Sequence, residues 1–250
     1  MFKLFGKEYE NIWFTSDEHY GSDRHIFLSQ RLDFEEDTIA KKKVLDENNV
    51  PTYIKTMMMN SVYGSTVVTP IDKMNTILIN RHNLFVGKSD IVFHVGDFGD
   101  YSIAEKLNGD HVLVMGNYEE DDMNKNFGGD IQQFKEHILS EYNFIHVCQH
   151  INNIGADVVL NEAMQKEIYA VNVTHKPEDC IRNTQDNTPK QIEDGRYYMC
   201  LFGHIHEKQK IKRFGINVGV DNNHYYPMSL SSINFYFNAI LHHYDENVFM

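Results

Sequence analysis

The chain has 250 residues, a net charge of −13, and 42% hydrophobic and 24% charged residues. This composition is typical of a soluble globular protein with enough length to bury one large core. The acidic balance argues against an extended nucleic-acid groove, because such surfaces are basic. No segment approaches the ~18 consecutive apolar residues that a membrane span needs, so we expect no membrane association.

The cysteines and the first residues bear on the cellular compartment. Cys148, Cys180 and Cys200 are widely spaced and form no CxxC pair. We interpret them as reduced thiols rather than as a disulfide framework or a zinc knuckle. Residues 1–10 are charged and contain no long apolar segment, so no signal peptide is expected. These features together predict a cytoplasmic protein.

Polar residues of metal-binding types follow three short apolar runs in the first half of the chain. Each run has the length and the aromatic or β-branched content of a buried strand. Open α/β sheets place functional residues at the carboxyl ends of their strands, and side chains two residues apart in extended backbone share one face. We therefore expect these residues to meet at one sheet edge. The runs with the residues that follow them are 11–16 with Asp17 and His19, 90–95 with Asp97, and 110–115 with Asn117.

Several of these positions also have an ordinary structural interpretation. Asp17 at the end of a strand can cap the helix that follows, and Gly116-Asn117 taken alone is common turn chemistry. Arg24 lies close to Asp17 in the sequence, where it could reach a substrate phosphate or form a surface salt bridge. Their repeated placement after apolar strands is what favours a functional role.

The second half of the chain adds three histidines at predicted strand ends. A strand over 168–173 ends before His175, and Pro177 prevents it from continuing. An apolar run over 198–202 leads into residues 203–206 (GHIH), where glycine permits a turn and two imidazoles can face one cavity. Taken alone, this pair could equally be one structural and one surface histidine. Histidine is the commonest side-chain ligand of divalent metals, so all three are candidate ligands.

The remaining segments predict a single domain over 1–250, because no composition break marks a linker. Residues 33–70 are expected to be an insertion beside the main fold, and the polar stretch 179–196 a surface loop. Apolar residues at helical spacing favour several helices around the strands. Helices are expected over about 26–31, 72–85, 102–107, 130–142 and 231–243, and further strands over 143–147, 158–160 and 208–220.

Seven candidate ligands thus stand at the ends of predicted strands. Two four-coordinate metal sites that share one carboxylate require seven protein ligands. A mixture of carboxylate, amide and imidazole suits Mn²⁺, Fe, Zn²⁺ or Ni²⁺ better than Ca²⁺. Histidines without this context, such as His94 and His146, are expected in core or surface positions. The seven are Asp17, His19, Asp97, Asn117, His175, His204 and His206.

The order of these motifs resembles the calcineurin-like metallophosphoesterase family over nearly the whole chain apart from 33–70. The family pattern of DxH, GDxxD, GNH[DE], a lone H and GHxH appears here as DEH, GDFGD, GNYE, His175 and GHIH. The segments FTSDEHYGSDR, DIVFHVGDFG and NVGVDNNHYYPMSL are similar to a small, capless bacterial and phage-type subgroup. The resemblance implies an α/β fold built as a four-layer αββα sandwich of two mixed sheets.

The resemblance also implies a centre of two divalent metal ions, with Mn²⁺ expected first and Fe, Zn²⁺ or Ni²⁺ as alternatives. One position departs from the pattern, because Tyr118 replaces the family histidine that assists the leaving group. A phenol can donate a hydrogen bond, but it exchanges protons poorly near neutral pH. The implied ligands are Asp17, His19 and His206 for one metal, Asn117, His175 and His204 for the other, and Asp97 as the bridge.

The expected function is hydrolysis of a phosphodiester, such as a nucleotide-type or other small diester, by hydroxide generated between the two metals. Tyr118 and Arg24 would stabilise charge on the departing group or on the phosphoryl oxygens, beside Asp97 and Asn117. Two alternatives stay open. One is a phosphomonoesterase acting on a nucleotide or a phosphoprotein, and the other is a metal-bearing scaffold with little turnover. The natural substrate and the oligomeric state are not determined by the sequence.

Overall fold

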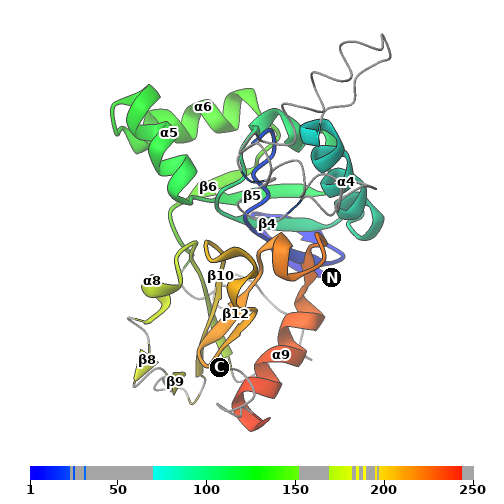
Figure 1. Cartoon of the computed structure of the whole chain (residues 1–250), viewed down its shortest axis with the longest axis vertical. Coiled ribbons are helices and arrows are strands. Elements are labelled where there is room, and N and C mark those ends of the chain that lie inside the picture. Colours follow the sequence, from blue (N-terminus) through cyan, green and yellow to red (C-terminus); the bar gives the residue numbers. More distant parts are fainter. Residues whose placement is uncertain are drawn as a thin grey trace, which may run out of the picture.

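The fold was analysed in a computed structural model (Figure 1). The expected insertion at 33–70 lies almost entirely outside the described residues, and Arg24 and the strand expected at 158–160 lie wholly outside them. The structure describes residues 1–22, 25, 31, 70–151, 169–181, 184–185, 188–189, 195 and 197–243.

A five-stranded sheet occupies the upper half of Figure 1, with strand order β13-β3-β4-β5-β6. Strands β3 to β6 are parallel, and β13 pairs with β3 in the antiparallel direction. Phe14, Phe93 and Val112 are neighbours across three adjacent strands, so one apolar row crosses the sheet. The strands are Ile12–Thr15 (β3), Ile91–Val95 (β4), Asp110–Val114 (β5), His146–Cys148 (β6) and Met228–Ser229 (β13).

A four-stranded sheet lies below it, with strand order β11-β12-β10-β7. The strand β10 is parallel to both of its neighbours, and β11 closes the sheet in the antiparallel direction. Two small antiparallel pairs, β1 with β2 and β8 with β9, complete the described strands. The bounds are Phe2–Leu4 (β1), Lys7–Tyr9 (β2), Tyr169–Val173 (β7), Thr184–Gln185 (β8), Thr188–Pro189 (β9), Tyr197–Phe202 (β10), Ile211–Lys212 (β11) and Gly215–Asn217 (β12).

The main apolar core lies between the two sheets and reaches helix α9 (Leu230–His243), with Phe93, Leu201 and Phe237 among its buried members. Because side chains alternate along a strand, the other face of the five-stranded sheet carries a second core. There Leu113 packs with residues of α4 and α6. The further helices are Pro70–Phe85 (α4), Asn117–Phe127 (α5), Ile131–Glu141 (α6) and Pro177–Ile181 (α8), with short 3₁₀ turns at Tyr101–Lys106, His206–Lys208 and Val220–Asn222.

The mixed α/β class expected from the sequence is confirmed, and the predicted strands and helices within the described residues occur with small shifts of their ends. None of the described helices is long and apolar enough to cross a membrane. One local expectation was wrong, and one helix was missed. Helix α8 and strands β8 and β9 interrupt the stretch expected to be a loop at 179–196, and residues 117–127 form a helix that was not predicted.

The expectation of three reduced cysteines was also wrong, because Cys180 and Cys200 form a disulfide. Their Cα atoms are 5.9 Å apart, since α8 packs against β10 and places its last turn over the middle of that strand. Cys148 at the end of β6 is a free thiol. Sequence spacing could not reveal the pair, because the contact arises from the packing of a helix on a strand.

Candidate metal centre

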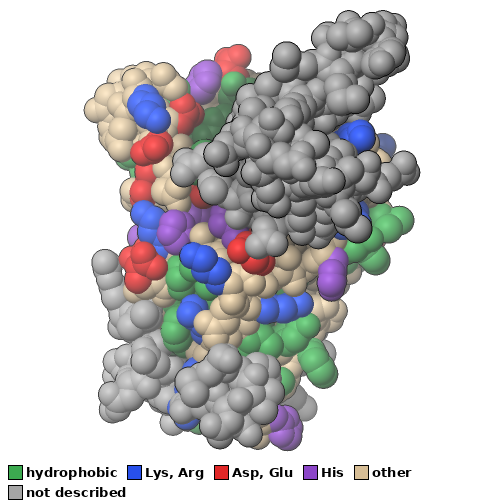
Figure 2. All heavy atoms as spheres, viewed as in Figure 1, with side chains coloured by type: hydrophobic (Ala, Val, Ile, Leu, Met, Phe, Trp, Pro, Cys, Tyr) green, Lys and Arg blue, Asp and Glu red, His purple; other side chains and the backbone are tan. Residues whose placement is uncertain are grey.

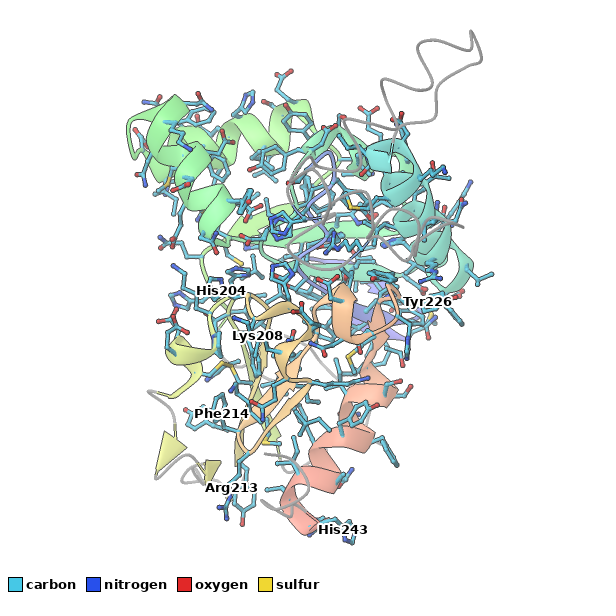
Figure 3. The ribbon with its side chains drawn as sticks, in the orientation of Figure 1. His204, Lys208, Arg213, Phe214, Tyr226 and His243 are labelled. Atoms are coloured by element: carbon cyan, nitrogen blue, oxygen red, sulfur yellow. A yellow bond between two sulfur atoms is a disulfide. The ribbon has the colours of Figure 1, made fainter. Side chains whose placement is uncertain are left out.

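The candidate residues converge where the carboxyl ends of strands from both sheets meet. Backbone hydrogen bonds join the loops there: the N–H of Asp17 donates to Gly96 O at 3.1 Å, and the N–H of His19 donates to Asp97 O at 3.0 Å. The N–H of Gly203 donates to His175 O at 3.0 Å, which ties the loops of the lower sheet together. His204 lies at the boundary between the sheets in Figure 3, and Figure 2 shows histidine side chains gathered at the same level.

Several candidate ligands have a left-handed backbone conformation, which residues other than glycine rarely adopt. Non-glycine residues with a left-handed φ are uncommon, and they concentrate at functional sites because the surrounding structure must hold them there. Eight such residues occur in the described part of the chain, and five of them are candidate ligands. Their φ values are 59° for Asp17, 50° for His19, 58° for Asp97, 71° for His204 and 49° for His206.

Asp97 lies at the centre of the cluster. Its Oδ2 atom is 3.6 Å from His19 Nε2 and 3.4 Å from His175 Nε2. Its Oδ1 atom accepts the backbone N–H of Tyr118 at 3.0 Å, so the carboxylate is held in one orientation. Burial alone would raise the pKa of Asp97, but the hydrogen bond and charge of His175 outweigh it and lower that pKa. One ionised oxygen therefore faces imidazoles on both sides.

The first half of the site contains Asp17, His19 and His206. The Asp17 carboxylate accepts the backbone N–H of His204 at 2.9 and 3.0 Å through its two oxygens. His19 is fully buried, and neither of its ring nitrogens has a hydrogen-bond partner among the described residues. Burial lowers the pKa of His19, so its ring is neutral and retains a lone pair. A buried imidazole left without a partner is costly in a folded protein unless it binds something.

A buried ion pair supports this half from behind. Asp221 Oδ2 accepts His206 Nδ1–H at 2.7 Å, which directs the other nitrogen, Nε2, into the site. Arg31 donates to Asp221 at 2.8 and 3.0 Å, to the backbone oxygen of Glu18 at 2.6 Å, and to that of Asp17. Burial would raise the pKa of Asp221, but the charge of Arg31 lowers it, so the carboxylate stays ionised.

The second half contains Asn117, His175 and His204. Asn117 Oδ1 lies 3.1 Å from His175 Nε2 and 3.0 Å from His204 Nδ1, so three potential donor atoms to a metal converge. His175 Nδ1–H donates to Val95 O at 2.8 Å, which points Nε2 inward. Burial would lower the pKa of His175, but hydrogen bonding and charge from Asp97 raise it to about 9. The negative charge around His175 therefore favours a positive charge at this position.

Glu119 fixes the loop that carries Asp97. Its carboxylate accepts the backbone N–H groups of Asp97 at 2.8 Å, Phe98 at 3.0 Å and Gly116 at 2.7 Å. Burial raises the pKa of Glu119 to about 7. Gly116 is required here, because a Cβ atom at that position would overlap the Asp97 carboxylate and lie 2.6 Å from the Asp97 backbone nitrogen.

Glu18 points away from the site into the second core. Its Oε1 atom lies 2.6 Å from His94 Nδ1, and His94 Nε2 lies 3.0 Å from His111 Nδ1. The other oxygen, Oε2, has no partner in the part of the chain that the structure describes. Burial raises the pKa of Glu18 to about 8. His94 is thus a core residue, as expected, but it belongs to a buried polar chain that holds the segment between Asp17 and His19.

Tyr118 lies beside the first half and meets a residue that sequence reasoning missed. Its hydroxyl is 2.9 Å from His25 Nε2, and the His25 ring stacks on His19 with centroids 3.4 Å apart. Burial lowers the pKa of His25 to about 4. The other proposed substrate contact, Arg24, lies outside the described residues.

The structure therefore brings all seven candidate ligands together, with donor atoms in three groups that could each hold a cation. Sequence reasoning missed the supporting residues. Glu119 had a partial signal, because a glutamate in the first turn of a helix can accept the backbone N–H of the N-cap residue, as Glu119 does from Gly116. Arg31, His25 and Asp221 had none, since their contacts join segments far apart in the sequence. The three donor groups are Asp17, His19 and Asp97; Asp97, His175 and His204; and His19, His25 and His206.

Comparisons with known proteins provide little beyond this geometry. No protein-family model matches the chain, and no curated protein matches it. A solved structure of a protein of unknown function from Aquifex aeolicus is similar with a TM-score of 0.49 and 16% sequence identity. The match covers 90% of this chain and 98% of that one. A similarity at this level supports no conclusion about function.

Proposed function

We propose that this protein is a dinuclear metal-dependent phosphoesterase that hydrolyses a small phosphodiester. The observation that carries the proposal is the position of Asp97 Oδ2 between His19 Nε2 and His175 Nε2, at 3.6 and 3.4 Å. A carboxylate oxygen that lies between two groups of imidazole and oxygen ligands is suited to bridge two cations.

The donor chemistry fits two divalent ions. Asp17, His19 and His206 would hold one ion, and the unpartnered nitrogens of buried His19 fit this role. Binding there would satisfy a ring that the described protein atoms leave unsatisfied. Oxygen and imidazole ligands without thiolate fit Mn²⁺ first, and Fe, Zn²⁺ or Ni²⁺ as alternatives. The ligands of the other ion would be Asn117, His175 and His204, with Asp97 shared.

The arrangement of sheets and helices in layers also supports the proposed phosphoesterase. The two mixed sheets pack face to face across the main core, while α4 and α6 cover the outer face of one sheet and α8 packs on β10 of the other. We assign this arrangement to the αββα sandwich of calcineurin-like phosphoesterases. The candidate ligands then lie at one end of the paired sheets, where five loops meet.

In this proposal the side chains orient the substrate and form no covalent bond with it. When bound, the two cations supply a nucleophilic hydroxide from water and neutralise charge on the phosphoryl oxygens. Asp97 is held by the N–H of Tyr118, and its loop by Glu119. Tyr118 presents a phenol to the reacting group where the family has an imidazole. General acid assistance is typically worth ~10²–10⁴-fold, so a weaker donor fits substrates with good leaving groups.

The experiment is hydrolysis of bis-p-nitrophenyl phosphate and p-nitrophenyl phosphate by Mn²⁺-loaded protein, with metal content measured in parallel. We expect faster turnover of the diester, loss of activity in EDTA, and loss of both activity and bound metal in Asp97→Asn. Asp130→Asn is the matched control, because Asp130 is an exposed cap of α6. Faster turnover of the monoester would favour the phosphomonoesterase. Two bound metals without turnover of either ester would favour the scaffold.

A further inference from the structure

The disulfide between Cys180 and Cys200 joins two segments that each carry a candidate ligand of the second half. Cys180 lies in the last turn of α8, and His175 stands in the loop just before that helix. Cys200 lies in the middle of β10, and His204 follows the end of the same strand. Because α8 packs on β10 (Figure 1), the bond fixes the segment that carries His175 against the strand that leads to His204.

The position of α8 depends on tertiary contacts. A helix of five residues has little stability of its own, because it is too short to offset the cost of nucleation. Cys180 is buried in an apolar cluster with Cys200 and Phe202, and Ile205 packs against this cluster. The disulfide therefore lies in the apolar contact directly behind the turn that carries His204.

Backbone hydrogen bonds lie between the disulfide and the two histidines. The N–H of Thr174 donates to Leu201 O at 3.1 Å, and the N–H of Gly203 donates to His175 O at 3.0 Å. The rings of His175 and His204 meet edge-on, with centroids 5.1 Å apart. A shift of α8 along β10 would change these contacts and move the two rings apart.

A cavity of about 350 Å³ lies beside the disulfide. Both cysteines line it, and so does Thr174, which immediately precedes His175 in the chain. Cys180 and Cys200 are only 2% and 4% exposed, so a reagent would approach their sulfur atoms through this cavity. A cavity of this size can hold a small organic molecule.

We propose that the Cys180–Cys200 disulfide is a redox-sensitive clamp, whose reduction by a small dithiol weakens cation binding at the second half of the site. That a cation binds there rests on the proposed function. In the reaction, one thiolate of the dithiol attacks a cysteine sulfur and breaks the S–S bond, and its second thiolate then displaces the other sulfur from the mixed disulfide. The two cysteines gain two electrons and two protons and become thiols, while the dithiol is oxidised to a cyclic disulfide.

The test is calorimetric titration of oxidised and reduced wild-type protein with Mn²⁺, after anaerobic gel filtration has removed the dithiol. Thiol titration should count one free thiol, Cys148, before reduction and three after it. We expect reduction to weaken one of two Mn²⁺ sites about 10-fold, as loss of support for a metal ligand typically does, and reoxidation to restore it. The other site should keep its affinity.

Three variants sharpen the experiment. The double variant Cys180→Ser, Cys200→Ser imitates the reduced state, so it should show the weakened affinity and no response to dithiol. Cys148→Ser is the matched control, because this free thiol at the end of β6 takes no part in the bond, and it should respond as wild type does. His204→Ala removes a candidate ligand of the second half, so the Mn²⁺ site that remains should not respond to dithiol.

Several results would overturn the inference. They are equal Mn²⁺ affinities in the oxidised and reduced wild type, equal weakening of both sites, or a full response in His204→Ala. A thiol count that does not change between oxidising and reducing treatment also overturns it. Unfolding of the reduced wild type, seen by circular dichroism, would show a bond that holds the whole fold. The wild-type comparison decides the question even if a variant fails to fold.

Failure of the proposed function is distinguishable from failure of this inference. Wild-type protein that binds two Mn²⁺ ions but hydrolyses neither ester overturns the enzyme, whereas the comparison of oxidised and reduced protein still decides the role of the disulfide. Turnover together with two Mn²⁺ affinities that do not change on reduction overturns the inference alone. Absence of Mn²⁺ binding in both forms overturns both.

Discussion

The two halves of the candidate centre are built differently, although each contains three candidate ligands beside Asp97. In the first half Asp17 and His19 are buried and His206 is partly exposed, and Arg31 and Asp221 hold His206 and the backbone of Asp17 from behind. In the second half, His175 and His204 lie within hydrogen-bonding distance of the ligand Asn117, and His204 and Asn117 are partly exposed.

This difference indicates how the protein behaves without metal. The ligands of the second half can satisfy one another through Asn117, so that half loses little when empty. The described surroundings of His19 provide no hydrogen-bond partner for its ring. The first half therefore depends on its supporting residues to stay in place, and it has more to gain from a cation.

The largest effect is expected from Arg31→Ala, which removes the guanidinium partner of the buried Asp221 carboxylate and leaves two backbone oxygens without their donor. Breaking a buried pair from one side typically costs ~3–5 kcal/mol of unfolding free energy. Urea denaturation of the metal-free protein measures this loss of unfolding free energy. The control in the second half is Lys176→Ala, which removes a partly exposed pair with Glu120 at 3.2 Å and should cost at most ~1 kcal/mol. Equal losses in the two variants would contradict the comparison.

A loss of metal affinity at one of the two sites is expected from Asp221→Asn, besides the loss of stability that follows from breaking the same buried pair with Arg31. The carboxylate orients His206, and such supporting carboxylates are typically worth 10–100-fold in metal affinity, about 1.4–2.8 kcal/mol. Calorimetric titration with Mn²⁺ should show the loss at one of two sites, while the site formed by His175 and His204 keeps its affinity. Equal weakening of both sites would show that Asp221 acts on the fold as a whole.

A smaller effect is expected on the pH dependence of metal-free stability. Burial raises the pKa of Glu18 to about 8, against 4.5 for its ordinary value. The folded state therefore holds this proton more tightly, so the stabilisation is complete below pH 4.5 and is lost as the pH rises through 8. Between pH 6.5 and 8.5, wild-type protein should lose about 2 kcal/mol more unfolding free energy than Glu18→Gln.

Denaturation at a series of pH values measures this difference. The neighbouring His94 has a pKa lowered to about 3 by burial, so its own contribution is lost only as the pH falls from 6.5 and does not affect this window. Parallel stability curves for wild type and Glu18→Gln above pH 6.5 would show that Glu18 is ionised in the folded protein.

The sequence by itself determined the local structure and most of the candidate ligands. The apolar runs that became β3, β4, β5 and β10 are followed by polar residues. A buried strand requires apolar side chains, and the turn after it favours glycine and short polar side chains. Neighbouring residues encode both properties. Helices α4, α6 and α9 were predicted for the same reason, since their apolar stripes follow the helical period.

Tertiary structure alone decided which distant residues support the site. Arg31 meets Asp221 across 190 positions, and His25 meets Tyr118 across 93. The disulfide between Cys180 and Cys200 likewise depends on where α8 packs. Such pairs follow from strand order and from the packing of helices on sheets, which the whole chain sets at once. No local pattern of residue types records them, so the candidate ligands were predictable and the residues that support them were not.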